Sequence, residues 1–412
     1  MSLKEHRRRY GLTQEEVVAE VRKRALARGD GVIPGLNQRT VSRHENGHKR
    51  PGPYYQALYC EVYGATPFEL GFRLALPGES SDHEDVDRRE FIAGAAGLAA
   101  EAAFAALPVP PTRRLGDADV ARLRQSVVQL YKLDDQHGGA GAVYPLTLRT
   151  FHRVRGLVER AGYDAASGRA LRQLAGETAA KAGWLSFDAG RHGDARRWWL
   201  EATHWSRLAD VDSVTILATA SMAFEASDQR RPREAIDLAT AAQRIAGRAA
   251  TPRLASLLLA REALGHAGAR DAGSAHAALR RARDLAETRR DDDPGWLAFY
   301  GPANFSLHEY DAAMMLGDSA AAEGAARAAL ALGDPVAYPR NQALYTIRLA
   351  AALVARREID EGVAVASQAA AAAGALESAR VTRGIVAISE SLTPFTDDPG
   401  VRQFLDRTRR TV

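Results

Sequence analysis

The side chains with the most distinctive chemistry lie between residues 37 and 50. Arginine can pair bidentately with guanine and glutamine with adenine, and a helix docked in the major groove of DNA presents its first-turn residues and those one turn later to the base edges. Gln38, Arg39 and Ser42 have that spacing. The sequence therefore predicts that these three side chains read bases, while Val41 faces the core of the domain.

A second group of nearby polar and basic residues suits the phosphate backbone, where charge positions a protein without reading sequence. The group comprises Asn37, Arg43, Asn46, Lys49 and Arg50. The alternative interpretation is that Arg39 and Arg43 are ordinary solvated charges, with Arg43 pairing with Glu45.

Five short helices are expected to position these residues within residues 1–75. Thr13 and Glu16 form a capping box that starts a helix at Gln14, and Asn37 suits the N-cap of the helix that carries the base-reading residues. The expected helices cover approximately residues 3–10, 14–28, 37–45, 54–63 and 66–72.

Residues 12–50 resemble the helix-turn-helix of phage-repressor-like regulators (the Cro/repressor, or XRE, type), on the motifs LTQEE and TVSRHENG. The resemblance implies an operator-binding domain in which Gln14 anchors the second helix on a phosphate. The turn between the two helices is about a dozen residues longer than is usual in that family. Residues 22–35 either add phosphate contacts or embellish the surface, and the sequence favours neither.

The distribution of charge suggests where the domains end. Residues 1–75 carry 13 basic and 8 acidic side chains, whereas residues 76–87 carry five acidic and no basic side chains. Such a polar, acidic segment cannot bury enough apolar surface to fold, which predicts a flexible linker over residues 76–90. An apolar helix and a Pro-rich connector are expected over residues 91–112, and the apolar run is shorter than the ~20 residues of a membrane span.

Residues 113–412 are expected to form stacked helical hairpins, because small residues recur with a spacing of 40 positions. The recurring sets begin at Ala195, Ala235 and Ala275. This part resembles tetratricopeptide-like repeats, although the characteristic Trp, Tyr and Pro positions of that consensus are missing. Together with Arg88-Arg89-Glu90-Phe91 at the junction, it is also similar to actinobacterial regulators that join such repeats to a helix-turn-helix. The predicted fold class is all-α, with an N-terminal five-helix domain followed by a tetratricopeptide-like solenoid.

The first helix of each hairpin usually lines the concave groove of such a solenoid, where peptides or protein segments bind. Trp184 and Phe224 share one register a repeat apart, which makes them candidates for that groove; the alternative is that they pack in the core. The candidate groove residues are Trp184, Phe187, Asp188, Phe224 and Asp228. Trp198, Trp199 and Trp205 are expected to pack between helices.

Signatures of other functions are missing from the sequence. Cys60 is the single cysteine, there is no glycine-rich phosphate loop or HExxH motif, and no export signal opens the chain. We therefore expect a cytoplasmic protein that is no enzyme and has no catalytic residue, metal site or cofactor. The expected function is a dimeric transcriptional regulator that binds a palindromic operator on double-stranded DNA and responds to a peptide, small-molecule or protein effector. The alternative is a protein-interaction scaffold in which DNA binding is accessory.

Overall fold

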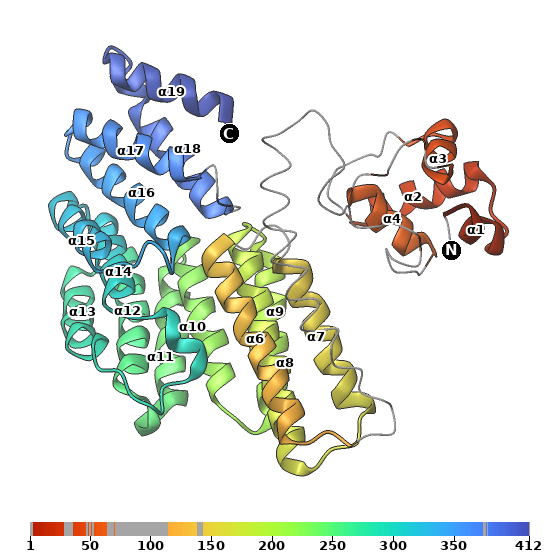
Figure 1. Ribbon diagram of the computed structural model, residues 1–412. Coiled ribbons are helices and arrows are strands. Elements are labelled where there is room, and N and C mark those ends of the chain that lie inside the picture. Colours follow the sequence, from red (N-terminus) through yellow and green to blue (C-terminus); the bar gives the residue numbers. More distant parts are fainter. Residues whose placement is uncertain are drawn as a thin grey trace. The chain divides into compact units, whose positions relative to one another are not determined.

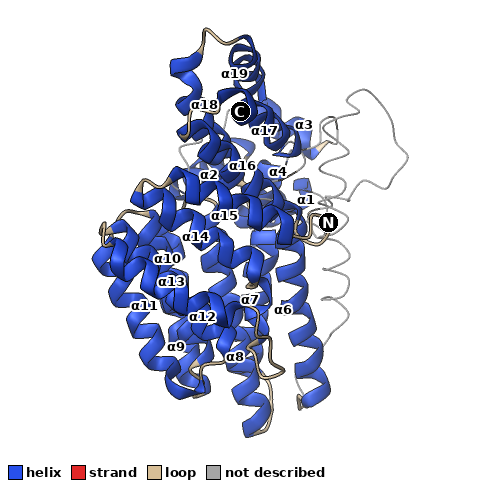
Figure 2. Cartoon of the chain, turned by 90° about the vertical axis from the view of Figure 1, so that its left-hand side faces the viewer, coloured by secondary structure: helices blue, strands red, loops and turns tan. Residues whose placement is uncertain are grey.

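The computed structural model describes residues 3–28, 36–46, 48, 51, 53–63, 70, 114–137, 143–373, 376 and 378–411. The chain divides into two compact units, Met1–Glu84 and Asp85–Val412. In the described residues all regular secondary structure is helical, with one isolated bridge between Leu115 and Tyr163 (Figures 1 and 2). The predicted all-α fold class is confirmed. Of the expected fifth helix at 66–72 only Leu70 is described, and the acidic linker at 76–90 and the apolar segment at 91–112 lie outside the described residues.

Four helices of the first unit are described: α1 (Leu3–Arg9), α2 (Gln14–Arg28), α3 (Gln38–Glu45) and α4 (Pro53–Tyr63). All four contribute to one core, whose members include Leu3, Val17, Val21, Val41, Leu58, Tyr59 and Tyr63. The predicted capping box at the start of α2 is present, since the Thr13 backbone N–H donates to Glu16 Oε2 at 2.6 Å and the Glu16 N–H donates to Thr13 Oγ1 at 3.2 Å. Arg22 on α2 donates to the carbonyl of Leu36 at 3.0 Å. This bond connects α2 with the residues that directly precede α3.

The second unit is a succession of antiparallel helices. Two helices precede the hairpins, α6 (Asp117–His137) and α7 (Val143–Arg160). Six hairpins follow, and Figure 1 shows them stacked in chain order from yellow-green to blue: α8 (Ala165–Asp188) with α9 (His192–Ala209), α10 (Ser213–Asp228) with α11 (Pro232–Ala246), α12 (Pro252–Gly268) with α13 (Ala272–Ala286), α14 (Pro302–Leu316) with α15 (Ser319–Leu332), α16 (Pro339–Ala355) with α17 (Ile359–Ala373), and α18 (Ala379–Leu392) with α19 (Pro399–Thr411). This is the expected helical repeat fold.

The turns inside five of these hairpins share one conformation. A residue with positive φ ends the first helix in each case: Gly190, Arg230, Arg270, Gly317 and Arg357. The two N–H groups of the turn donate back into the helix in the same pattern, as from Arg230 to Ser227 at 3.1 Å and from Arg231 to Ala226 at 2.8 Å. These residues therefore define a common register along the first helices α8, α10, α12, α14 and α16.

A longer connection between α13 and α14 interrupts the 40-residue spacing. It contains the 3-10 helix η2 (Gly295–Phe299), and its Trp296 and Tyr300 are buried. The Trp296 indole donates to Ser213 at 2.9 Å, and the Tyr300 hydroxyl lies 2.8 Å from Ser256 Oγ. The sequence analysis did not predict that this segment packs into the core.

Two buried polar contacts join parts of the second unit that are distant in sequence. Asp134 on α6 accepts from Lys181 on α8 and from Arg340 on α16, both at 2.5 Å. At the end of α8, Asp188 accepts from Ser378 at 3.2 Å and lies 3.8 Å from Arg380 on α18. The first hairpin therefore contacts the last one directly.

Candidate functional site

The predicted base-reading residues lie at the start of α3. Asn37 caps this helix, because its side chain accepts from the Thr40 N–H at 2.9 Å. Gln38 and Arg39 are exposed, Ser42 is half-buried, and Val41 is 1% exposed within the core, as expected. The start of α3 therefore presents Gln38 and Arg39 to the outside of the unit.

The predicted phosphate-contacting residues are in varied environments. Arg43 is exposed, and within the described residues it forms no ion pair. The Asn46 side chain donates to the Ser42 carbonyl at 2.9 Å and accepts from Lys4 at 3.3 Å, so its polar atoms already have partners. Lys49 and Arg50 lie outside the described residues. Contact of these side chains with phosphate stays a prediction.

The alternative expectation that Glu45 pairs with Arg43 is wrong. Glu45 points into the unit with 2% of its side chain exposed, and it binds Arg7 of α1 at 2.6 Å. Gln14 donates to the same carboxylate at 2.8 Å. The hydrogen bond to Glu45 raises the pKa of Arg7. Glu45 thus joins the ends of three helices, α1, α2 and α3, and the Gln14 amide that was expected on phosphate is turned toward it.

In the second unit the predicted groove residues come together. The Trp184 and Phe224 rings stack with centroids 6.1 Å apart, and Phe187 packs against both, at 5.5 and 5.7 Å. Trp184 and Phe224 are half-buried, whereas Phe187 is 2% exposed. The shared register of Trp184 and Phe224 therefore produces one aromatic cluster that spans the first helices of two hairpins.

The two aspartates predicted for this groove differ in environment. Asp188 is buried and bound by Ser378 and Arg380, whereas Asp228 is exposed and accepts from Gln229 at 3.1 Å. The guanidinium of Arg380 also lies 5.7–5.9 Å from the rings of Trp184, Phe187 and Phe224. Arg380 therefore adds a cation to the aromatic cluster from the last hairpin.

A row of polar side chains, four of them basic, repeats along the first helices of the hairpins. Nine positions before the positive-φ turn residue, the first helices of five hairpins carry Lys181, Ser221, Arg261, His308 and Arg348. The first four are at most 7% exposed, and Arg348 has 15% of its side chain exposed. We call these five residues, four of which are basic and one of which is Ser221, the basic row. Sequence reasoning missed it, although Lys181, Ser221 and Arg261 follow the 40-residue spacing.

The ends of the basic row are neutralised. Lys181 binds Asp134 at 2.5 Å, and Arg348 binds Asp311 at 3.1 Å. Although burial opposes its ionisation, the Arg340 and Lys181 cations hold the pKa of Asp134 below its usual value. Burial raises the pKa of its neighbour Asp135 to about 6.

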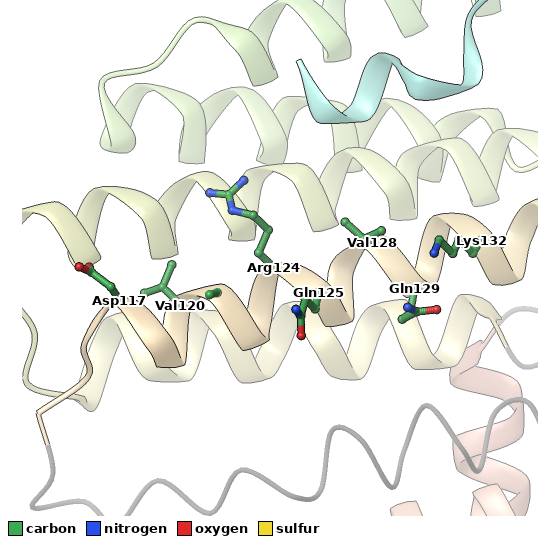
Figure 3. A pocket seen from close by; sticks show the side chains of 8 residues that line it. Asp117, Val120, Arg124, Gln125, Val128, Gln129 and Lys132 are labelled. Carbon is green, nitrogen blue, oxygen red and sulfur yellow. The ribbon is translucent and has the colours of Figure 1, made fainter. Parts of the chain in front are cut away.

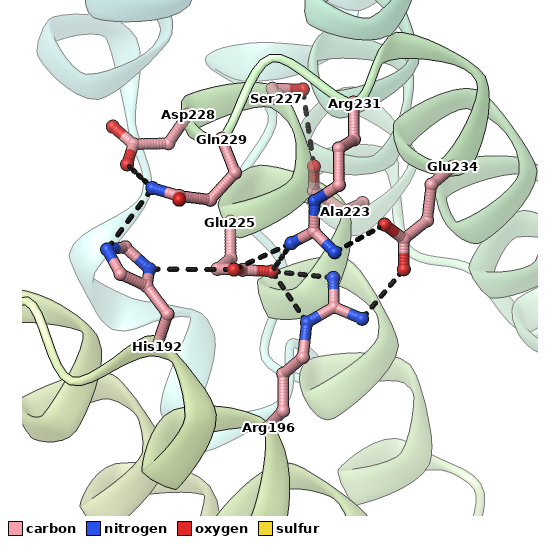
Figure 4. Close-up of polar contacts among 9 residues, drawn as sticks. All are labelled: His192, Arg196, Ala223, Glu225, Ser227, Asp228, Gln229, Arg231 and Glu234. Atoms are coloured by element: carbon pink, nitrogen blue, oxygen red, sulfur yellow. Dashed lines mark hydrogen bonds and ion pairs between the residues drawn. The ribbon is translucent and has the colours of Figure 1, made fainter.

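A separate ionic network links successive hairpins (Figure 4). Glu225 of α10 is 1% exposed and lies at its centre. It binds Arg196 of α9 at 2.6 Å and Arg231 at 2.8 Å, and both arginines also bind Glu234 of α11. Because all charges in this network have partners and come from neighbouring hairpins, its role is to fix one hairpin against the next.

A shallow hollow lies along α6. Figure 3 shows the side chains that line it, among them Arg124, Val128 and Lys132, following one face of this helix. Val128 is 46% exposed. The described lining residues come from one helix and do not converge on a common point, so this hollow is not a candidate for a specific site.

The described residues contain neither a candidate membrane span nor a candidate metal site. None of the described helices combines the length and apolar character of a membrane span. In the same residues no three His, Cys, Asp or Glu side chains are grouped as metal ligands would be.

Comparison with known proteins gives a structural similarity only. No model of a known protein family matches the chain, and no curated protein matches it. The crystal structure of a Rap protein complexed with Competence and Sporulation Factor is similar, with a TM-score of 0.43 and 13% sequence identity, over 79% of this chain and 97% of that chain.

Proposed function

We propose that the second unit is a binding module for a peptide or a protein segment, held at the cluster of Trp184, Phe187 and Phe224. The observation that carries the proposal is the pair of half-buried rings, Trp184 and Phe224, beside the half-buried cation Arg380. Aromatic side chains flanked by charge are the residues that most often dominate protein-binding surfaces. This supports the interaction scaffold, given above as the alternative, more directly than it supports a regulator.

A selection of peptides tests the module. A phage-displayed random peptide library would be selected on the full chain, and the affinity of selected peptides measured by calorimetry. Trp184→Ala and Phe224→Ala should weaken binding more than tenfold. The matched control is Leu200→Ala, which truncates a side chain that is 62% exposed on the second helix of the same hairpin and should leave affinity unchanged.

A purely structural role for Trp184 gives a different result. Loss of a well-packed Trp costs about 3–5 kcal/mol of stability. A large fall in melting temperature for Trp184→Ala, with peptide affinity unchanged, would rule out this surface as the binding site.

A second candidate function, sequence-specific DNA binding by the first unit, is favoured by the exposure of Gln38 and Arg39 at the start of α3. Both are suited to base edges, and Asn37 fixes the beginning of their helix. If the first unit binds DNA, the chain is a cytoplasmic regulator whose repeat unit binds the effector. Such a regulator would bind a palindromic operator as a dimer. Selection of bound duplexes from a random-sequence DNA pool tests this, since an enriched motif supports it and unselective binding contradicts it.

A further inference from the structure

The middle of the basic row differs from its ends. Arg261 of α12 is 4% exposed, and its Nε and Nη1 atoms are buried without a hydrogen-bond partner in the described residues. His308 of α14, at the next position of the row, is 3% exposed and has an unpartnered Nε2. Both residues therefore hold buried polar atoms whose bonding capacity is unused.

The contrast with Lys181 shows that this is not a general property of the row. Lys181 occupies the equivalent position of α8 and is as buried as Arg261, yet it binds the carboxylate of Asp134. The carboxylate that interacts electrostatically with Arg261 is that of Asp311, and Asp311 already binds Arg348 at 3.1 Å. Arg261 is thus a buried cation without an ion-pair partner among the described residues.

A buried, unpaired charge is unfavourable for folding, because desolvation of the ion is not offset by a counter-charge. Burial lowers the pKa of Arg261 only to about 9, which leaves the guanidinium charged at neutral pH. Burial also lowers the pKa of His308 well below its usual value, so that its ring is neutral there. The row consequently presents one uncompensated positive charge beside a neutral imidazole.

The surroundings of Arg261 connect it with the aromatic cluster. Its guanidinium lies 3.9 Å from the centre of the Phe224 ring, and the same ring lies 6.1 Å from Trp184 and 6.2 Å from His308. Because Phe224 is half-buried, Arg261 lies one side chain below the surface on which we place the peptide.

We propose that Arg261, with His308 beside it, is a binding site for a carboxylate group of the peptide, and that Trp184 and Phe224 hold an apolar side chain next to that carboxylate. This inference rests on the proposed function of the second unit. A buried guanidinium whose Nε and Nη1 atoms lack partners is suited to a carboxylate, to which it can donate a charge-assisted hydrogen bond. The Phe224 ring must turn aside to admit the ligand.

The same peptide selection tests the inference when it is run on the full chain, on Arg261→Met and on Arg280→Met. Arg280 is exposed on α13, the second helix of the same hairpin, so the control removes an equal charge outside the site. Peptides selected on the unmodified chain should be enriched in Asp or Glu next to an aromatic or aliphatic residue. Arg261→Met should weaken their binding about 10- to 100-fold, since hydrogen bonds to charged groups have this magnitude, and Arg280→Met should not. Changing the acidic residue of a selected peptide to its amide should have the same effect as Arg261→Met.

Melting temperatures without peptide separate a ligand site from a structural role. Removal of an unpaired buried charge should leave the melting temperature of Arg261→Met unchanged or raise it, whereas loss of a structural arginine would lower it. The carboxylate site is overturned if Arg261→Met lowers the melting temperature. It is also overturned if acidic peptides bind Arg261→Met as tightly as they bind the unmodified chain. Selected peptides without acidic residues overturn it while leaving the proposed function intact, and a selection that yields no peptide contradicts the proposed function itself.

Discussion

The indole of Trp199 on α9 packs directly against the backbone of Gly183 on α8. A Cβ added to Gly183 would lie 2.5 Å from Nε1 and 2.6 Å from Cδ1 of this indole. Trp199 is fully buried, so it has little room to move. This contact sets how closely the two helices of the first hairpin approach each other.

Gly183→Ala should therefore destabilise the second unit by about 1–3 kcal/mol, the usual penalty for overpacking a core. The measurement is urea unfolding followed by circular dichroism. Gly324→Ala on α15 is the matched control, because a Cβ there meets nothing within 4 Å and φ is not positive. The control should stabilise the chain by about 0.5–1 kcal/mol, the helical preference for Ala over Gly. Equal effects of the two substitutions would contradict the close approach of Trp199.

The positive-φ turns give a second prediction. Gly317 has φ +86° and open space around its Cβ position, so Gly317→Ala tests backbone conformation without a steric clash. We expect a loss of about 1 kcal/mol, since L-residues pay about 1–2 kcal/mol in this region. Arg270 has φ 63° and is exposed. Arg270→Gly should consequently be neutral or stabilise by up to about 1 kcal/mol; a clear loss in thermal melts would show that this turn is not strained.

The adjacent residues Asp134 and Asp135 should respond to neutralisation with opposite signs. The folded chain raises the pKa of Asp135 from 3.8 to about 6, mainly by burial. Between about pH 4 and 6 the folded state thus keeps a proton that the unfolded state has lost, and stability falls as the pH rises through this window. Asp135→Asn should stabilise the chain by about 2–3 kcal/mol above pH 6, and this gain should vanish near pH 4.

Asp134→Asn is the matched comparison. Its folded pKa is lowered by Arg340 and Lys181 against the effect of burial, so its charge contributes stability at neutral pH that is lost in acid. Removing one partner of a buried ion pair costs about 3–5 kcal/mol. Urea unfolding at pH 7.5 and at pH 4.5 measures both variants, and a stabilising Asp134→Asn at pH 7.5 would contradict the buried pairing.

The roles of Arg39 and Arg43 can be separated on DNA. Arg39→Ala should cost about 1–3 kcal/mol on a selected operator and relax preference at one base pair of each half-site. Arg43→Ala should weaken operator and scrambled duplexes by similar factors and reduce the salt slope by about 1 per subunit. Titrations at several salt concentrations measure this. If Arg39→Ala weakened both duplexes equally, the proposed register of α3 on DNA would be wrong.

The features that the sequence predicted well have short-range causes. The capping box of Thr13 and Glu16, the N-cap at Asn37 and the buried positions of Ala195, Ala235 and Ala275 each depend on residues a few positions apart or on a regular repeat. These signals were sufficient for the helices and for the stacking of the hairpins.

The ionic contacts were not predictable in the same way. Arg340 and Asp134 are separated by 206 positions, and in the sequence each looks like an ordinary solvated charge. The alternative interpretation paired Glu45 with Arg43 of its own helix, but in the fold Glu45 pairs with Arg7 of α1. Arg261 and His308 do carry a sequence signal, since they share a register with Lys181, but this register becomes visible only when the turn residues are aligned.

The contact of Asp188 with Ser378 and Arg380 has a consequence for how the second unit unfolds. A linear array of hairpins, each touching only its neighbours, can open from either end one repeat at a time. Here the first hairpin is bonded to the last through Asp188, so that these two hairpins cannot separate without exposing this buried carboxylate. We therefore expect the first and last hairpins to melt together, rather than one repeat at a time from each end.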